Sequence, residues 1–183
     1  MRYASQTHPL GLRPVPLAAT PTASSMTCRF AYTVRDTQSG ACLVATRDIA
    51  RGARILLIDG RLQRHPTRYS IQLDIDVHIE CDSELESSEM RARHPWRFLN
   101  HACNPNARVY GRILFARRAI GAGDEITFDY TTTEISMAEP FHCGCGAAKC
   151  LGLVRGFVHL DAAQRRARAA RIAPHLQSVI GSA

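Results

Sequence analysis

Lysine is almost absent from this sequence, which has a single one, Lys149, among 23 basic residues. Nearly all of the positive charge is therefore arginine, a side chain suited to bidentate contact with carboxylates or phosphates. The formal net charge of +7 is consistent with two interpretations, an acidic partner such as nucleic acid or a solvated basic surface. Charge alone favours the solvated surface.

Long apolar runs are also absent. No stretch approaches the length of a membrane-spanning helix, so no membrane association is expected. The first 26 residues have no secretory-type apolar core and are rich in Pro, Ala, Thr and Ser, so we expect a flexible tail over 1–26. Their Arg, Ser and Thr content only faintly resembles a transit peptide. Seven cysteines without such a signal favour a reducing intracellular compartment, the nucleus in a eukaryote or the cytoplasm in a bacterium.

Short β-like segments follow one another from Phe30, separated by glycine-containing turns. The predicted strands are 30–35, 43–46, 54–58, 69–73, 77–80, 112–115 and 125–130. A short helix is predicted over 83–91 with Asp82 or Ser83 as cap, a helical turn over 96–100, and an Ala/Arg-rich helix between Asp161 and Pro174. The sequence therefore predicts one mostly β domain with short helices.

Three cysteines stand close together in the motif Cys143-Gly-Cys145-x4-Cys150. The neighbouring glycines allow this loop to wrap around an ion, and thiolates are common ligands of structural zinc. Because such a zinc takes four ligands, a fourth donor must come from elsewhere. His142 is one candidate, although its position next to Cys143 makes joint tetrahedral binding awkward. The alternative is a set of reduced or disulfide-bonded cysteines without metal.

Two further segments carry polar and aromatic groups. The segment 97–106 places the pair Asn100-His101, with fixed hydrogen-bond donors and acceptors, ahead of an Asn-Pro-Asn turn. The segment 121–130 combines a glycine turn with a predicted strand, on which Phe128 and Tyr130 are expected to share a face. Taken singly, the first segment is only a good turn and the second only a turn followed by a strand.

Taken together and in order, these motifs resemble the SET-domain lysine methyltransferases with a cysteine-rich post-SET segment. The matching motifs are Asn100-His101-x-Cys103-x-Pro105-Asn106, Gly123-Asp-Glu-Ile-Thr-Phe-Asp-Tyr130 and C-x-C-x4-C. The resemblance covers about 30–157 and implies the SET β-rich fold, with a pseudoknot in which chain near Tyr130 threads the 100–106 segment. The expected parts are a tail (1–26), a SET domain (27–137), a zinc-binding post-SET loop (138–157) and a C-terminal helical tail (158–183).

The resemblance also implies roles for individual residues. Tyr130 is the expected catalytic tyrosine, Tyr69 an aromatic wall of the lysine channel, and Phe128 the residue that limits the number of methyl groups. The expected contacts to S-adenosylmethionine are Gly40, Ala41, Cys42, Arg97, Asn100, His101, Tyr130 and Leu151. Cys103 is expected to complete the zinc site with Cys143, Cys145 and Cys150.

The implied function is transfer of methyl groups from S-adenosylmethionine to a lysine of a protein or peptide, with histones as one candidate. More than one methyl is expected, because Phe128 lacks the hydroxyl with which a tyrosine holds a space-filling water. Two alternatives remain open. The segment Gly40-Ala-Cys42 keeps only one glycine of the family's first cofactor loop, and the C-terminal tail is rich in arginine. Both features favour a catalytically silent SET-like module that binds peptide or nucleic acid. The second alternative is an enzyme that methylates a small amine.

Overall fold

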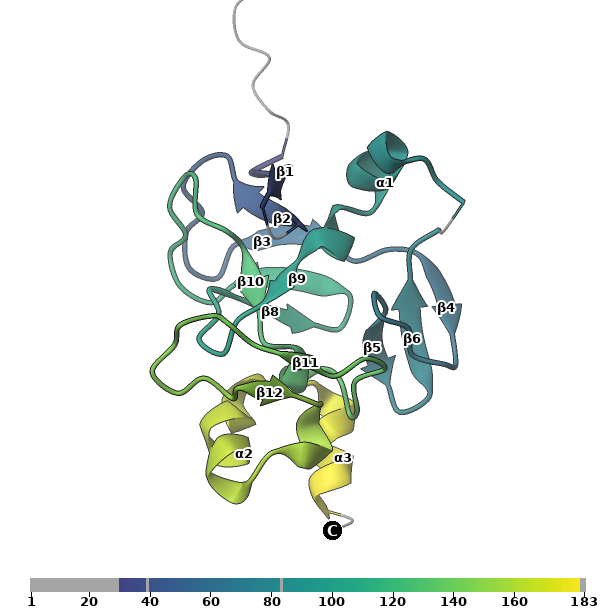
Figure 1. Cartoon of the computed structure of the whole chain (residues 1–183), viewed down its shortest axis with the longest axis vertical. Helices are drawn as coiled ribbons and strands as arrows, with labels where there is room; N and C mark the ends of the chain where they lie inside the picture. The colour runs from purple at the N-terminus through teal and green to yellow at the C-terminus, as the bar shows by residue number, and fades with distance from the viewer. Residues whose placement is uncertain (1–29, 39, 83, 182–183) are drawn as a thin grey trace, which may run out of the picture.

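A computed structural model describes residues 30–38, 40–82 and 84–181 (Figure 1). The strands are β1 Tyr32–Thr37, β2 Gly40–Ala45, β3 Arg54–Leu57, β4 Arg61–Gln63, β5 Ile71–Asp74, β6 Val77–Glu80, β7 Asn100–His101, β8 Ala107–Tyr110, β9 Ile113–Ala116, β10 Thr127–Phe128, β11 Phe141–His142 and β12 Leu153–Val154. The helices are α1 Ser87–Arg93, α2 Ala162–Arg168 and α3 Pro174–Gly181, with 3-10 turns η1 Pro95–Phe98, η2 Tyr130–Thr132, η3 Phe157–His159 and η4 Ala169–Arg171. The expected mostly β fold with short helices is confirmed, whereas the tail predicted over 1–26 lies outside the described residues.

The strands form small sheets rather than one continuous sheet. Two antiparallel sheets of three strands have the orders β3-β9-β8 and β4-β6-β5, and β1 and β2 form a separate antiparallel pair. The parallel pair β7–β10 and the antiparallel pair β11–β12 complete the arrangement. Figure 1 shows α2 and α3 at the end of the long axis opposite to β1 and β2. The small sheets together enclose a single main core.

The main core is aliphatic and lies between these sheets. Leu43, Ile58, Ile79 and Leu114 are completely buried in it. Trp96 is also buried, and its indole N–H donates to the carbonyl of Asp59 at 2.8 Å, so the polar edge of this ring is satisfied. A second cluster of Phe157, Leu160, Ile172 and Leu176 joins the C-terminal helices to the preceding segment. The C-terminal tail is therefore packed onto the domain.

Two predicted elements differ from the observed ones. The helix expected over 83–91 begins at Ser87 with Glu86 as its N-cap, because Asp82 instead accepts from the backbone of Glu84 and Leu85 in a turn. The strand expected over 125–130 contains only Thr127 and Phe128. Asp129 ends it by accepting from the Thr131 N–H, so that Tyr130 begins a 3-10 turn. The predicted common strand face of Phe128 and Tyr130 is therefore wrong, although their ring centroids lie 4.8 Å apart.

The Ala/Arg-rich helix predicted between Asp161 and Pro174 is present and begins where expected. Asp161 caps α2 through a reciprocal capping box with Gln164, and α2 ends before Pro174 as expected. The sequence reading missed α3, for which Pro174 supplies the first residue. Within the part of the chain that the structure describes, no helix has the length and apolarity needed to cross a membrane.

Candidate active site and metal centre

The two polar segments of the sequence meet through a short parallel pairing. Asn100 lies opposite Thr127 and His101 opposite Phe128, and the Ala102 N–H donates to the carbonyl of Phe128 at 3.1 Å. This β7–β10 pairing is the contact that the expected pseudoknot requires. It places the Asn-His pair directly beside the segment that carries Tyr130.

His101 holds this junction together. Its Nδ1 accepts from the Tyr130 N–H at 3.1 Å, and its Nε2 lies 3.3 Å from the Cys103 sulfur. Burial lowers the pKa of His101 to about 4, with Arg168 acting in the same direction and Asp129 against it. A neutral ring whose Nδ1 accepts must carry its proton on Nε2, which faces the sulfur. His101 therefore connects the tyrosine backbone to the cysteine cluster.

Tyr130 is held in a fixed orientation by polar and aromatic contacts. Its hydroxyl donates to the carbonyl of Leu99 at 2.5 Å, and its ring contacts those of Phe128, His101 and Phe141. Burial raises the pKa of the phenol, and the nearby carboxylates of Glu134 and Glu125 raise it further. Tyr130 is therefore a protonated, oriented hydroxyl at neutral pH.

A narrow pocket of about 40 Å³ opens beside Tyr130. Tyr69, Phe128 and Tyr130, the three residues with expected catalytic roles, all line it. Arg97 lines the same pocket, and its guanidinium carbon lies 3.6 Å from the centroid of the Tyr69 ring. The structure thus brings the three aromatic residues together, and it places Arg97 against Tyr69. Their individual roles stay predictions.

Glu134 is a pocket residue that the sequence reading missed. Its side chain is buried, and its Oε1 accepts from the Gln72 N–H at 2.8 Å and from the Thr133 hydroxyl at 3.1 Å. Burial raises the pKa of Glu134 to about 7, and these two donors act in the opposite direction. Within residues 30–38, 40–82 and 84–181, no arginine, lysine or histidine forms an ion pair with it. A lone acidic residue after a threonine run carries no recognisable signal in the sequence.

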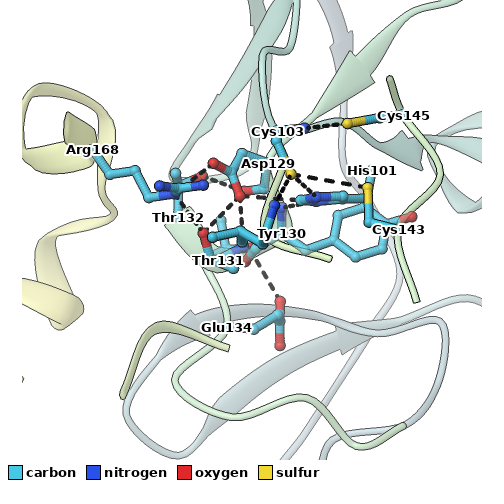
Figure 2. Close-up of polar contacts among 12 residues, drawn as sticks. His101, Cys103, Asp129, Tyr130, Thr131, Thr132, Glu134, Cys143, Cys145 and Arg168 are labelled. Atoms are coloured by element: carbon cyan, nitrogen blue, oxygen red, sulfur yellow. Dashed lines mark hydrogen bonds and ion pairs between the residues drawn. The ribbon is translucent and has the colours of Figure 1, made fainter. Parts of the chain in front are cut away.

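Asp129 is a second buried carboxylate that the sequence reading missed. Figure 2 shows it between Arg168 of α2 and the side of the site that carries His101 and Tyr130. It accepts from Arg168 Nε at 2.8 Å and from Arg171 Nη2 at 3.3 Å, and it also binds the Thr131 hydroxyl. Arg168 itself is 4% exposed. The C-terminal tail therefore contributes directly to the scaffold behind Tyr130.

The neighbours of the remaining expected cofactor contacts show where these residues lie. Asn100 Nδ2 donates to Glu125 Oε1 at 2.7 Å, and Glu125 also forms a backbone bridge with Val44 of β2, the strand that carries Gly40, Ala41 and Cys42. Burial and then the charge of Glu125 raise the pKa of the Cys42 thiol. Leu151 lies at the cysteine cluster, where its N–H points at the Cys103 sulfur at 3.4 Å. The same sulfur lies 3.3 Å from His101 Nε2. Asn100 and Glu125 thus form a polar pair beside β2, and Glu125 is a third residue whose role the sequence did not predict.

Cys103, Cys143, Cys145 and Cys150 form one cluster, with all four sulfur atoms within 4.8 Å of one another. The Cys103 sulfur lies 3.9 Å from that of Cys143 and 4.0 Å from that of Cys150. Four thiolates around a tetrahedral zinc would stand about 3.8 Å apart, since each Zn–S bond is roughly 2.3 Å. All six cysteines that the structure describes are free, and His142 is not part of the cluster. The donor set therefore fits a zinc ion.

The thiols of the cluster differ in their readiness to ionise. Burial raises the pKa of Cys143 to about 11. Burial acts in the same direction on Cys145, but the N–H groups of Cys103 and Ala147 and the thiols of Cys143 and Cys150 outweigh it and lower that pKa to about 6. The cluster thus offers at least one thiolate near neutral pH, which is the form that binds metal.

Comparison with known families agrees with this geometry. The family described as SET domain matches residues 40–131, which is half of the chain and includes the segments that meet at the β7–β10 pairing. The chain belongs to the SET-domain family.

Curated relatives match over part of their length. Methyltransferase flvH of Aspergillus flavus is 37% identical over 100 residues, which cover 52% of this chain and 50% of that protein. A histone-lysine N-methyltransferase, H3 lysine-36 specific, of Candida albicans is 39% identical over 93 residues, which cover 46% of this chain and 11% of that protein. The chain therefore spans about half the length of the first relative and a small part of the second.

Solved structures share the fold. The methyltransferase domain of human histone-lysine N-methyltransferase SETMAR superposes with a TM-score of 0.52 at 19% identity, covering 70% of this chain and 59% of that one. KRYPTONITE in complex with mCHG DNA and SAH superposes with a TM-score of 0.51 at 24% identity, covering 68% of this chain and 29% of that one. At these identities the likeness concerns the fold alone.

Proposed function

We propose that this chain is an S-adenosylmethionine-dependent protein-lysine N-methyltransferase. The observation that carries the proposal is the narrow pocket beside Tyr130, which has aromatic walls and a buried carboxylate, Glu134. Arg68 and Arg97 also line this pocket, but within the described residues neither forms an ion pair with Glu134. A narrow pocket with aromatic walls and an acid that has no ion-pair partner suits an unbranched apolar chain that ends in a positive charge. Lysine is the amino-acid side chain with this shape. Relatives named as histone-lysine N-methyltransferases support the same substrate class.

The pocket also suits deprotonation of the lysine. A free lysine has a pKa of about 10.4, so its amine must lose a proton before it can act as a nucleophile. Transfer of that proton from the ammonium to the Glu134 carboxylate replaces two buried charges by two neutral groups, which apolar surroundings favour. The pKa of Glu134, raised to about 7 by burial, makes this carboxylate a suitable acceptor.

Positioning of the amine falls to Tyr130 and its neighbours. The Tyr130 hydroxyl and the Leu99 carbonyl that it binds stand at the pocket, so together they can orient the amine for in-line attack. When bound, S-adenosylmethionine supplies an electrophilic methyl group on its sulfonium sulfur. We propose that the residues that contact S-adenosylmethionine are Gly40, Ala41, Cys42, Arg97, Asn100, His101, Tyr130 and Leu151. Glu125, which binds the Asn100 amide, adds a carboxylate suited to the positive charge of that molecule.

The four-cysteine cluster is proposed to bind one zinc ion that fixes the loop 141–152 against His101. Because ligand binding and local folding share one free energy in such sites, Cys145→Ser should loosen this loop and lower activity. Metal analysis of the purified chain should find one zinc per molecule in the wild type. A wild-type value well below one would contradict the metal proposal and leave the lysine pocket untouched.

The catalytic role of Tyr130 can be tested with Tyr130→Phe. The exposed tyrosine of β8 provides a matched control, Tyr110→Phe. With labelled S-adenosylmethionine and a histone mixture or cell extract, we expect a loss on the order of 100-fold for Tyr130→Phe and wild-type turnover for the control. Full activity of Tyr130→Phe would contradict the mechanism. Zinc without any methyl transfer would indicate a silent module, and label confined to small amines would indicate a metabolite enzyme.

The number of methyl groups is a separate part of the proposal. Phe128 is 3% exposed and contacts the Tyr130 ring, so a hydroxyl added at its ring would fill part of the same pocket. We propose that the wild type adds more than one methyl and that Phe128→Tyr keeps the first transfer and slows later ones. Mass spectrometry of a lysine peptide over time measures both. Arrest of the wild type at one methyl under excess S-adenosylmethionine would contradict this proposal.

A further inference from the structure

A second cavity, separate from the pocket beside Tyr130, lies between the β8–β9 sheet and the η4 turn. Its volume is about 430 Å³, and four arginines line it: Arg51, Arg108, Arg117 and Arg171. The remaining lining residues are one glycine and three alanines, whose short side chains leave the cavity open. We refer to it as the arginine cleft.

The fold brings these arginines together from four segments. Strand β8 alternates, so Arg108 points outward while Ala107 and Val109 are buried. The Gly52 N–H donates to the carbonyl of Ala116 at 2.8 Å, which holds the turn with Arg51 against the end of β9. The η4 turn supplies Arg171 from the C-terminal tail.

Arg117 is fixed by the fold itself. Its Nε donates to the carbonyl of Pro105 at 3.1 Å, and its Nη2 donates to Asn104 Oδ1 at 3.0 Å. Both acceptors are neutral, so they orient the guanidinium without cancelling its charge. The Asn-Pro-Asn turn thus holds the Arg117 guanidinium in place at the cleft.

The positive charge of the cleft is poorly compensated. Asp129, which contacts Arg171, is the one carboxylate in the described residues that forms an ion pair with a lining arginine. Burial lowers the pKa of Arg117, and the charges of Arg171 and Arg118 lower it further. Arg51 and Arg108 are exposed, and no hydrogen bond to either side chain is found within the described ranges. Like charges held together in this way attract an anion with several charges.

We propose that the arginine cleft binds an anion with at least two linked phosphate groups. Guanidinium groups form bidentate hydrogen bonds with phosphate oxygens, and linked phosphates concentrate several charges in a small volume. The volume of the cleft lies in the usual range for small-molecule sites, roughly 300–1,000 Å³. The linked phosphates can belong to a free phosphorylated compound or to a nucleic-acid backbone. The site is independent of the proposed methyl transfer.

Calorimetric titration of the full chain with sodium tripolyphosphate at about 0.15 M salt tests the proposal. We expect saturable one-to-one binding that Arg51→Gln and Arg108→Gln each weaken by about tenfold or more, since each removes a charge-assisted contact. Arg61→Gln, in the exposed part of β4, removes the same charge outside the cleft and should change affinity less than about twofold. All three side chains are exposed, and thermal melting checks that each variant is folded.

Two further titrations identify the source of the phosphates. A single-stranded oligonucleotide that binds more tightly than tripolyphosphate, through the same two arginines, assigns the cleft to a nucleic-acid backbone. Tighter binding of tripolyphosphate assigns it to a free compound. The proposal is overturned if tripolyphosphate binding does not saturate, if Arg61→Gln weakens it as much as Arg108→Gln, or if a glutamate-rich peptide binds equally well.

Discussion

Asp129 and Glu134 are buried carboxylates on either side of Tyr130, yet their surroundings differ. Asp129 is 1% exposed and accepts from two guanidinium groups, those of Arg168 and Arg171. Glu134 is 5% exposed, and among the described residues its side chain accepts only from the neutral groups of Gln72 and Thr133. In Figure 2 the Asp129 carboxylate lies next to Arg168, whereas the Glu134 carboxylate lies on the other side of Thr131.

This difference indicates that Asp129 stabilises the fold, whereas Glu134 is free to bind a cationic ligand. A buried acid with its own cations is compensated within the fold, so Asp129 serves to attach the C-terminal tail behind Tyr130. A buried acid without a cation favours its protonated form or a cationic ligand, so Glu134 suits a substrate ammonium. The comparison predicts that variants of the two acids, or of their partners, will change different properties.

The largest expected effect is on stability, when the ion pair between Asp129 and Arg168 is broken. Arg168→Met leaves Asp129 buried beside a single, longer contact to Arg171 and should lower the free energy of unfolding by about 3–5 kcal/mol. Urea unfolding of the variant measures this loss. Arg166→Met, on the exposed side of the same helix, is the matched control and should cost less than about 0.5 kcal/mol. Equal stability of the two variants would show that Asp129 does not depend on the tail.

The uncompensated acid should give stability a distinctive pH dependence. The pKa of Glu134 rises from 4.5 to about 7 on folding, so the folded state binds more protons between these values. The unfolding free energy should therefore fall as pH rises from about 4.5 to 7, by up to about 3 kcal/mol. Glu134→Gln removes this dependence and should be more stable than the wild type at pH 8, with little difference at pH 4.

Urea unfolding of both proteins at several pH values measures the effect. The difference between wild type and Glu134→Gln isolates this one group, because all other titrating groups are common to both chains. Glu89→Gln, in the exposed first turn of α1, controls for the loss of one acidic residue. Parallel stability curves for wild type and Glu134→Gln would show that the carboxyl titrates normally in the folded protein.

The sequence predicted those parts of the site that consist of residues close together in the chain. The close cysteines of the 143–150 loop predicted a metal cluster, and the resemblance supplied Cys103, which the structure places beside them. The Asp161 cap could likewise be predicted, because a capping box involves residues that are only three positions apart. Local patterns of this kind need no knowledge of the tertiary fold.

Contacts between residues far apart in the sequence could not be predicted from local patterns. Arg168 is one of several arginines in the predicted Ala/Arg-rich helix, and nothing near it in the sequence points to Asp129 as its partner. The length of β10 was overestimated, because the alternation of 125–130 does not reveal that Asp129 turns the chain by accepting from Thr131. The arginine cleft has the same origin, as its four arginines converge only through the tertiary fold.

The smallest expected effect is on catalysis by Glu134. If its carboxylate takes the substrate proton, wild-type activity should rise with pH through about 7, the pKa of that group. Glu134→Gln should lower turnover at pH 7 by about tenfold, the low end for a general base, because proton removal precedes methyl transfer and solvent can also accept it. The variant should lose the rise near pH 7 and gain activity only at higher pH, as the lysine itself deprotonates. A pH profile of kcat/KM for both proteins measures this, with Glu89→Gln as control. An unchanged profile shape with uniformly lower activity would assign Glu134 a packing role at the Gln72 backbone instead.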